Sequence, residues 1–192
     1  LAEPPRSGLE NVALQALDEL TLQASFDRAD YTTGEVIRDG LVDEVQASAN
    51  FNQGFITVEF IAAAFLDMAW HTLEEPVEHE ARAFENAEMA RIGLIPEIIP
   101  RYRSTYYSHI FDGGYSAGYY AYLWAEVLDK DAFQAFVETG DLFDPATARS
   151  LRENILSRGG TLPGMEMYVN FRGREPSIQA LLEARGLTGV AN

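Results

Sequence analysis

The sequence predicts an all-α protein, and three observations support this fold class. Apolar residues recur at the three- and four-residue spacing of helices, and 47% of the 192 residues are hydrophobic, which is enough for a core. Residues that start and stop helices separate these runs, as Asp144-Pro145 and Gly159-Gly160 do near the C-terminus. No segment shows the convincing alternation of apolar and polar residues that marks a strand.

The apolar periodicity orders the helices of the first half. A leucine-rich run occupies 9–22, a turn-like cluster follows at 27–34, and a short helix is expected over 41–49. The most apolar helix covers 51–73. Its apolar residues lie almost all the way round, which predicts burial on several sides, and Pro76 ends it.

The second half continues the helical pattern. A charged surface helix is expected over 77–92, and the prolines and glycines of 93–114 exclude one continuous helix there. A long helix is predicted over 115–137. Three shorter helices are expected over 145–157, 165–171 and 177–185.

The acidic composition argues against partners that are themselves negatively charged. Fourteen Lys+Arg against 30 Asp+Glu give a net charge of −16, which repels phosphate backbones and anionic lipid. No nucleic-acid or membrane partner is therefore expected, and no apolar run approaches the roughly 20 residues that cross a bilayer. Arg172 and Arg174 are predicted to form salt bridges. The absence of cysteine excludes disulfides, thiolate nucleophiles and cysteine-based metal sites.

A tyrosine-rich segment is the most unusual part of the chain. Residues 101–124 hold seven of the nine tyrosines. On a helix beginning near Tyr115, residues Tyr115, Tyr119 and Tyr122 share one side. Phenols beside a Gly-Gly loop that carries a histidine can stabilise a developing oxyanion with neutral hydrogen-bond donors. Core tyrosines with their hydroxyls at the rim fit the same spacing, so both interpretations stay open.

Metal-binding templates are incomplete. A His-Glu-x-x-His helix places two imidazoles on one metal, but residues 79–83 lack the second histidine. His71 with Glu74, or Glu78 with His79, would be partial sets as well. No complete metal site is expected in this chain.

Several blocks, in order, resemble a known family. They are Tyr31-Thr-Thr-Gly-Glu-Val-Ile, Ala49-Asn-Phe-Asn-Gln-Gly-Phe55, Leu66-Asp-Met-Ala-Trp-His71, the tyrosine-rich stretch of 100–124, Ala125-Glu-Val-Leu, Asp131-Ala-Phe, Gly140-Asp-Leu-Phe-Asp144, Ile155-Leu-Ser-Arg-Gly-Gly160 and Phe171-Arg-Gly-Arg-Glu-Pro176. This pattern resembles the C-terminal part of the thimet oligopeptidase family of zinc metallopeptidases. Within that family it is most similar to the branch of bacterial peptidyl-dipeptidases and oligopeptidase A.

The resemblance implies a multi-helix C-terminal lobe of a larger, two-lobed helical peptidase with a deep channel. Residues 30–187 would be a portion of the catalytic domain that lacks the His-Glu-x-x-His part, 1–29 an uncertain N-terminal helical segment and 188–192 a tail. Family members cleave short peptides, and the peptidyl-dipeptidase branch removes dipeptides from the carboxyl end. Their Zn²⁺ ligands lie upstream of everything in this chain, so Zn²⁺ is expected in the complete enzyme and not on this chain.

The resemblance also assigns roles to single residues. Tyr122 matches a tyrosine that donates to the oxyanion of the tetrahedral intermediate, and His109 matches a histidine that supports the same region, so both are expected to be catalytic. The expected substrate-binding residues are Tyr115, Tyr119, Gly113 and Gly114.

These roles lead to the expected function. The chain would supply the substrate channel and transition-state stabilisation of a peptidase, and it would be inactive alone. The first residue is Leu1, and residues 1–8 lack the basic and apolar regions of a signal peptide, so the chain is expected to be a processed product, an expressed piece or a fragment. Short peptides, the missing upstream half and self-association through exposed apolar surface are the expected partners, in the cytoplasm. The alternative is a stand-alone, non-catalytic peptide-binding or scaffold protein.

Overall fold

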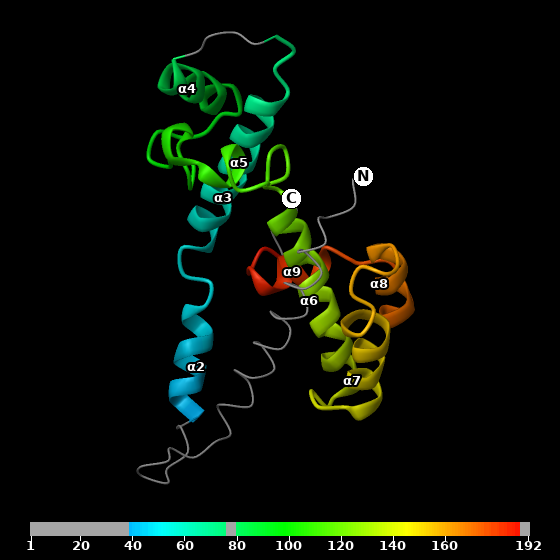
Figure 1. Cartoon of the computed structure of the whole chain (residues 1–192). Helices are drawn as coiled ribbons and strands as arrows, with labels where there is room; N and C mark the ends of the chain where they lie inside the picture. Colours follow the sequence, from blue (N-terminus) through cyan, green and yellow to red (C-terminus); the bar gives the residue numbers. More distant parts are fainter. Residues whose placement is uncertain (1–38, 76–79, 189–192) are drawn as a thin grey trace, which may run out of the picture. The chain divides into compact units, whose positions relative to one another are not determined.

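The computed structural model describes residues 39–75 and 80–188, and every regular element within these ranges is helical (Figure 1). The described residues form two compact units. The α6 unit comprises 39–51 and 121–188, and the α3 unit comprises the described part of 52–120. The predicted all-α class is confirmed for this part of the chain. The predictions for 9–22, 27–34 and Pro76 lie outside the described residues.

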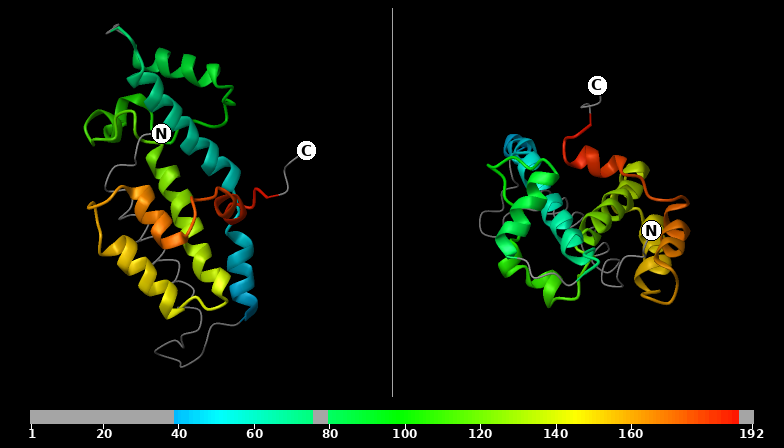
Figure 2. Two further views of the ribbon diagram at one scale, coloured as in Figure 1. Left: turned by 90° about the vertical axis from the view of Figure 1, so that its right-hand side faces the viewer. Right: turned by 90° about the horizontal axis from the view of Figure 1, so that it is seen from above.

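The α3 unit is built on two helices that share an apolar seam. Its elements are α3 (Gln53–His71), α4 (Ala81–Arg91), the 3₁₀ turn η1 (Ser104–Tyr106) and the short α5 (Ser108–Phe111). Helices α3 and α4 lie side by side in both figures (Figures 1 and 2). Their seam buries Ala62, Leu66 and Met89, with Trp70 and Phe84 packed against it.

Helix α3 is buried on one side only. Ala62, Ala63 and Leu66 are buried there, together with the carboxylate of Asp67. The other side is apolar and exposed and carries Val58, Phe65 and Met68, and Phe55 and Ile56 are exposed in the first turn of the helix. The prediction of burial on several sides is therefore wrong for the described structure, because α4 and the segment with Tyr107 and Tyr119 together cover only one side. Contrary to the expectation that no apolar run approaches the length of a membrane span, the 19-residue α3 is long and apolar enough to cross a membrane by length and composition, a test that core helices of soluble proteins pass as well.

Helix α4 begins directly after its N-cap residue, Glu80. The side chain of Glu80 accepts hydrogen bonds from the amides of Arg82 and Ala83, at 3.3 and 2.7 Å, which satisfies amides that lack a partner within the helix. On the inner side, Glu85 is buried and accepts from Arg103 Nε at 2.7 Å and from the Ser104 amide at 2.8 Å. These bonds attach the irregular segment after α4 to the helix pair.

The α6 unit follows the predicted order of helices. It consists of α2 (Asp39–Ser48), α6 (Ala121–Thr139), α7 (Pro145–Leu151), the π-helical turn η2 (Arg152–Leu156), α8 (Gly164–Arg172) and α9 (Gln179–Ala184). The predicted start of α7 is confirmed, because Asp144 accepts a hydrogen bond from the Thr147 amide at 2.7 Å and Pro145 follows it. One side of α6 packs on α7, η2 and α8 through a core of Ala125, Leu128, Ala132, Phe136, Leu151, Ile155, Tyr168 and Phe171.

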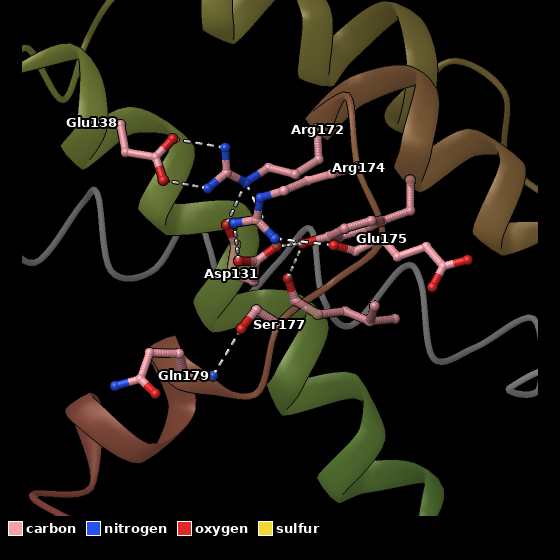
Figure 3. A network of polar contacts seen from close by, with 9 residues as sticks. Asp131, Glu138, Arg172, Arg174, Glu175, Ser177 and Gln179 are labelled. Carbon is pink, nitrogen blue, oxygen red and sulfur yellow. Dashed lines mark hydrogen bonds and ion pairs between the residues drawn. The ribbon is translucent and has the colours of Figure 1, made fainter. Parts of the chain in front are cut away.

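A buried network of charges joins α6 to the end of α8 (Figure 3). Asp131 is 1% exposed, and it accepts from the Tyr168 hydroxyl at 2.6 Å and from Arg174 Nη2 at 2.6 Å. Arg172 donates to the Asp131 carbonyl and, with both terminal nitrogens, to Glu138 at 2.7 and 2.5 Å. The predicted salt-bridging role of Arg172 and Arg174 is confirmed.

Candidate functional site

The glycine-containing turn after α5 carries the candidate site of the α3 unit. His109 lies in α5, and the amide of Tyr115 donates to the His109 carbonyl at 3.0 Å, so the chain folds back over the short helix. Gly113 is required at this point, since a Cβ there would lie 2.9 Å from both Cα and the carbonyl oxygen of His109. Gly114 has φ +80°, in the left-handed region that favours glycine.

Aromatic rings gather around His109. The centroid of its imidazole lies 4.6 Å from the ring of Tyr102, 5.8 Å from that of Tyr119 and 6.4 Å from that of Tyr115. Tyr107 completes the group, at 5.1 Å from Tyr119. Edge contacts among these rings hold the imidazole in one orientation. The Nδ1 atom of His109 is buried and has no hydrogen-bond partner in the described structure.

The two buried phenols of this cluster, Tyr107 and Tyr119, are neutral. Burial raises the pKa of Tyr119 to about 12, and the nearby guanidinium of Arg101, which hydrogen-bonds to Tyr119, offsets part of that rise. Burial raises the pKa of Tyr107 still further, and its hydroxyl donates to the Ala63 carbonyl at 3.3 Å. Both side chains therefore remain hydrogen-bond donors without charge at physiological pH.

The predicted helical stripe of tyrosines is wrong. Helix α6 begins at Ala121, and residues 115–120 form turns in which Ala117 has φ +53°. A left-handed residue interrupts the α-helical path, so the spacing of four and seven residues does not place Tyr115, Tyr119 and Tyr122 on one helix face.

The structure nevertheless brings part of the predicted set together. His109, Tyr115 and Tyr119 meet through their rings in the α3 unit, next to Gly113 and Gly114. Tyr115 is half-buried, whereas Tyr119 is 2% exposed and belongs to the core of the unit. Tyr122 is half-buried in the first turn of α6 and belongs to the other unit. For Tyr119, the interpretation as a core tyrosine is the one that its burial favours.

Sequence reasoning missed Asp67 and the ring partners Tyr102 and Tyr107. Asp67 is 0% exposed, and its two carboxylate oxygens accept from the amides of Ala117 and Tyr119. The acidic residue between Leu66 and Met68 in the apolar run of α3 was the available signal, because such a carboxylate must find donors. No periodicity indicates which donors it finds.

Two grooves of the α3 unit lie away from the predicted site residues. One of about 510 Å³ is lined by Val58, Ile61, Ala62, Phe65, Ile92, Gly93, Leu94, Ile95 and Ile98. Another of about 320 Å³ borders Glu85 and Arg103 between α4 and the segment that follows it. Neither is lined by a residue of the predicted site.

The described residues do not fit a zinc ion. Among 39–75 and 80–188, no group of three or more His, Asp or Glu side chains lies close enough to hold a metal. Catalytic zinc needs three protein ligands. No chemical step is therefore assigned to a metal held by these residues.

The chain belongs to peptidase family M3, a family of zinc metallopeptidases. The family model described as "Peptidase family M3" matches residues 12–187. The resemblance seen in the sequence blocks is thereby confirmed.

Curated relatives agree with this family. The dipeptidyl carboxypeptidase of Salmonella typhimurium is 43% identical over 157 residues, which are 81% of this chain and 23% of the relative. Oligopeptidase A of Escherichia coli is 37% identical over 170 residues, covering 86% of this chain and 24% of the relative. A probable cytosolic oligopeptidase A of Arabidopsis thaliana is 37% identical, covering 84% and 24%. The chain thus spans about a quarter of the length of the relatives it matches.

Proposed function

We propose that this chain forms the substrate-facing, transition-state-stabilising portion of an M3 peptidase that hydrolyses short peptides. Two facts support the proposal together: the chain belongs to a peptidase family, and one glycine-containing turn gathers His109 with Tyr115. The observation that carries it is this gathering, since the two residues are six positions apart and meet through a turn whose close approach to His109 leaves no room for a Cβ at Gly113.

The proposed roles in peptide hydrolysis differ from one site residue to the next. In the complete enzyme, zinc held outside the described residues supplies the metal chemistry of hydrolysis. His109, oriented by surrounding rings, donates to the substrate carbonyl region as negative charge develops, and Tyr115 contacts the substrate backbone. For Tyr122, the family resemblance supports a hydrogen-bond donor to the oxyanion. Gly113 and Gly114 allow the backbone to approach the peptide closely. Tyr119 is proposed as a buried residue behind this surface.

The test uses a chimera. This chain replaces the matching segment of the E. coli dipeptidyl carboxypeptidase, to which it is 43% identical over 159 residues. Removing one oxyanion donor typically costs 10²–10³ in turnover, so Tyr122→Phe is expected to lower kcat by about that factor and to leave KM nearly unchanged. Tyr115→Phe is expected to raise KM. Tyr120→Phe, an exposed phenol of the same segment, is the control.

The alternative function has a distinct outcome. A stand-alone peptide-binding or scaffold protein would bind short peptides with the isolated chain, and the chimera would gain no peptidase activity from it. Unchanged turnover in Tyr122→Phe would remove this residue from the mechanism. We expect the isolated chain to contain no zinc and to cleave no peptide, which metal analysis and a peptidase assay measure.

The exposed apolar side of α3 supports a further polypeptide partner. Val58 and Phe65 are 40% and 48% exposed on it, and both line the 510 Å³ groove. Exposed apolar patches of this kind mark interfaces. About three quarters of each relative's length lies outside the part that this chain matches, so we propose that the preceding part of such a polypeptide covers this side. Cytoplasm is the proposed compartment, in line with the name of the cytosolic plant relative.

A further inference from the structure

The carboxylate of Asp67 is buried in the middle of the most apolar helix. Its neighbours in the chain are Leu66 and Met68, and its side chain is 0% exposed. Moving a carboxylate out of water is costly unless donors replace the lost hydration. The identity of those donors therefore shows what the residue does in the fold.

The donors come from the turn that joins α5 to α6. The amide of Ala117 donates to Oδ1 at 2.9 Å, and the amide of Tyr119 donates to Oδ2 at 2.9 Å. Both bonds bridge 50 or more residues of sequence. His71, one turn further along α3, places Nδ1 at 2.8 Å from Oδ1. One side chain of α3 thus fixes two backbone positions of the turn.

The turn needs such an anchor. Residues 115–120 lie outside any helix, so their amides have no regular helical partners. Ala117 also has φ +53°, a conformation that costs free energy in a residue with a Cβ. A carboxylate that accepts two amides on either side of Gly118 stabilises this conformation against a helical one.

We propose that Asp67 is a positioning residue: it holds the 115–120 turn in place and so sets where Tyr115 and Tyr119 stand relative to the His109 ring. The consequence for catalysis rests on the proposed function. The structural part, that the Asp67 carboxylate fixes this turn, does not. Asp67 would act through the backbone of the turn and not by contact with the substrate.

Amide hydrogen exchange in the 192-residue chain tests the structural part. In the unsubstituted chain, the Ala117 and Tyr119 amides should be protected by about 100-fold or more, although they lie in a turn. In Asp67→Asn, which keeps the shape and removes one acceptor and the charge, their exchange should rise by about tenfold. Glu74→Gln, an exposed carboxylate just after α3, is the control and should change neither amide.

Kinetics in the chimera test the positioning part. Asp67→Asn is expected to lower kcat/KM by about tenfold, and the double variant with Tyr115→Phe should lose less than the product of the two single effects. If Asp67 had a purely structural role, the two substitutions would act independently, and the double variant would lose the full product of the two single effects on kcat/KM.

Each result decides the inference. Unprotected Ala117 and Tyr119 amides in the unsubstituted chain overturn it even if Asp67→Asn fails to fold. The positioning role is overturned if Asp67→Asn speeds amide exchange at Ala117 and Tyr119 but leaves kcat/KM of the chimera unchanged, or if its effect on kcat/KM is independent of Tyr115→Phe. A chimera without peptidase activity, measured before any substitution, counts against the proposed function instead, and the exchange data still decide whether Asp67 holds the turn.

Discussion

At the scale of single residues, the buried carboxylates differ in how they are satisfied. Asp67, Glu85 and Asp131 each accept hydrogen bonds from two or more donors. Asp129 is equally buried, at 1% exposed, but its Oδ1 has no partner and Lys130 Nζ stands 3.6 Å from Oδ2. Burial, with a smaller contribution from the charge of Glu126, raises the pKa of Asp129 to about 7.

This raised pKa predicts a pH dependence of stability. The folded chain holds a proton on Asp129 between about pH 4 and 7, where the unfolded chain has released it, so Asp129 makes stability fall as pH rises through this window. Asp129→Asn should remove that slope and increase the free energy of unfolding at pH 8 by about 1–3 kcal/mol. Urea unfolding at pH 5 and pH 8 measures both effects.

An exposed carboxylate of the same unit serves as the control for this pair of measurements. Glu166→Gln should leave the difference between pH 5 and pH 8 as it is in the unsubstituted chain. If Asp129→Asn leaves the pH dependence of the free energy of unfolding as it is in the unsubstituted chain, burial does not raise the pKa of Asp129.

The glycines of the candidate site give a second prediction for single residues. Gly113→Ala places a methyl group 2.9 Å from backbone atoms of His109, which have to move, and should destabilise the α3 unit by about 1–3 kcal/mol. Gly118→Ala is the matched control, because its methyl group meets its nearest neighbour at 3.4 Å and its φ is not positive. Thermal unfolding measures both. Equal effects of the two substitutions would show that the turn does not depend on the close approach at Gly113.

At the scale of elements, contacts at the helix ends decide where helices start. The sequence predicts one helix over 115–137, but α6 starts at Ala121 because the preceding amides donate to Asp67 and not to helical carbonyls. By contrast, Asp144 and Pro145 form a local start signal, and α7 begins where they place it. A local signal can be read from sequence, whereas a partner 50 residues away cannot.

The junction of α6 and α8 gives a prediction at the same scale. Asp131→Asn removes the charge that faces Tyr168 and Arg174 in a buried network (Figure 3) and should lower the free energy of unfolding by about 3–5 kcal/mol. Glu138→Gln, at the half-exposed end of the same network, should cost about 1 kcal/mol or less. Chemical denaturation measures both, and a similar cost for the two would contradict the assignment of Asp131 as the buried centre.

At the scale of the whole molecule, the two units differ in how their apolar surface is used. In the α6 unit, α6 faces α7, η2 and α8 through a shared core. In the α3 unit, α3 buries one side and exposes the other, with Val58 and Phe65 at 40% and 48% exposure. The proposed upstream polypeptide would cover that exposed side.

Without such a partner, the isolated chain is expected to self-associate. Apolar side chains of two copies would leave water together, so sedimentation should show dimers or larger species at micromolar concentration. Phe65→Ser should shift the chain toward monomer. Phe143→Ser, which removes an exposed phenylalanine of the α6 unit, should not. A monodisperse monomer before any substitution would argue against an uncovered interface.

The sequence by itself determined the all-α class, the order of most helices, the start of α7 and the family, because these depend on periodicity, local caps and ordered blocks of residues. It also indicated His109, Gly113 and Tyr115 as neighbours. Only the tertiary structure decided that 115–120 is a turn, that Tyr119 is buried and that Asp67 anchors this segment. Those features depend on the pairing of groups far apart in the chain, and a periodic pattern carries no information about which distant donor a buried carboxylate meets.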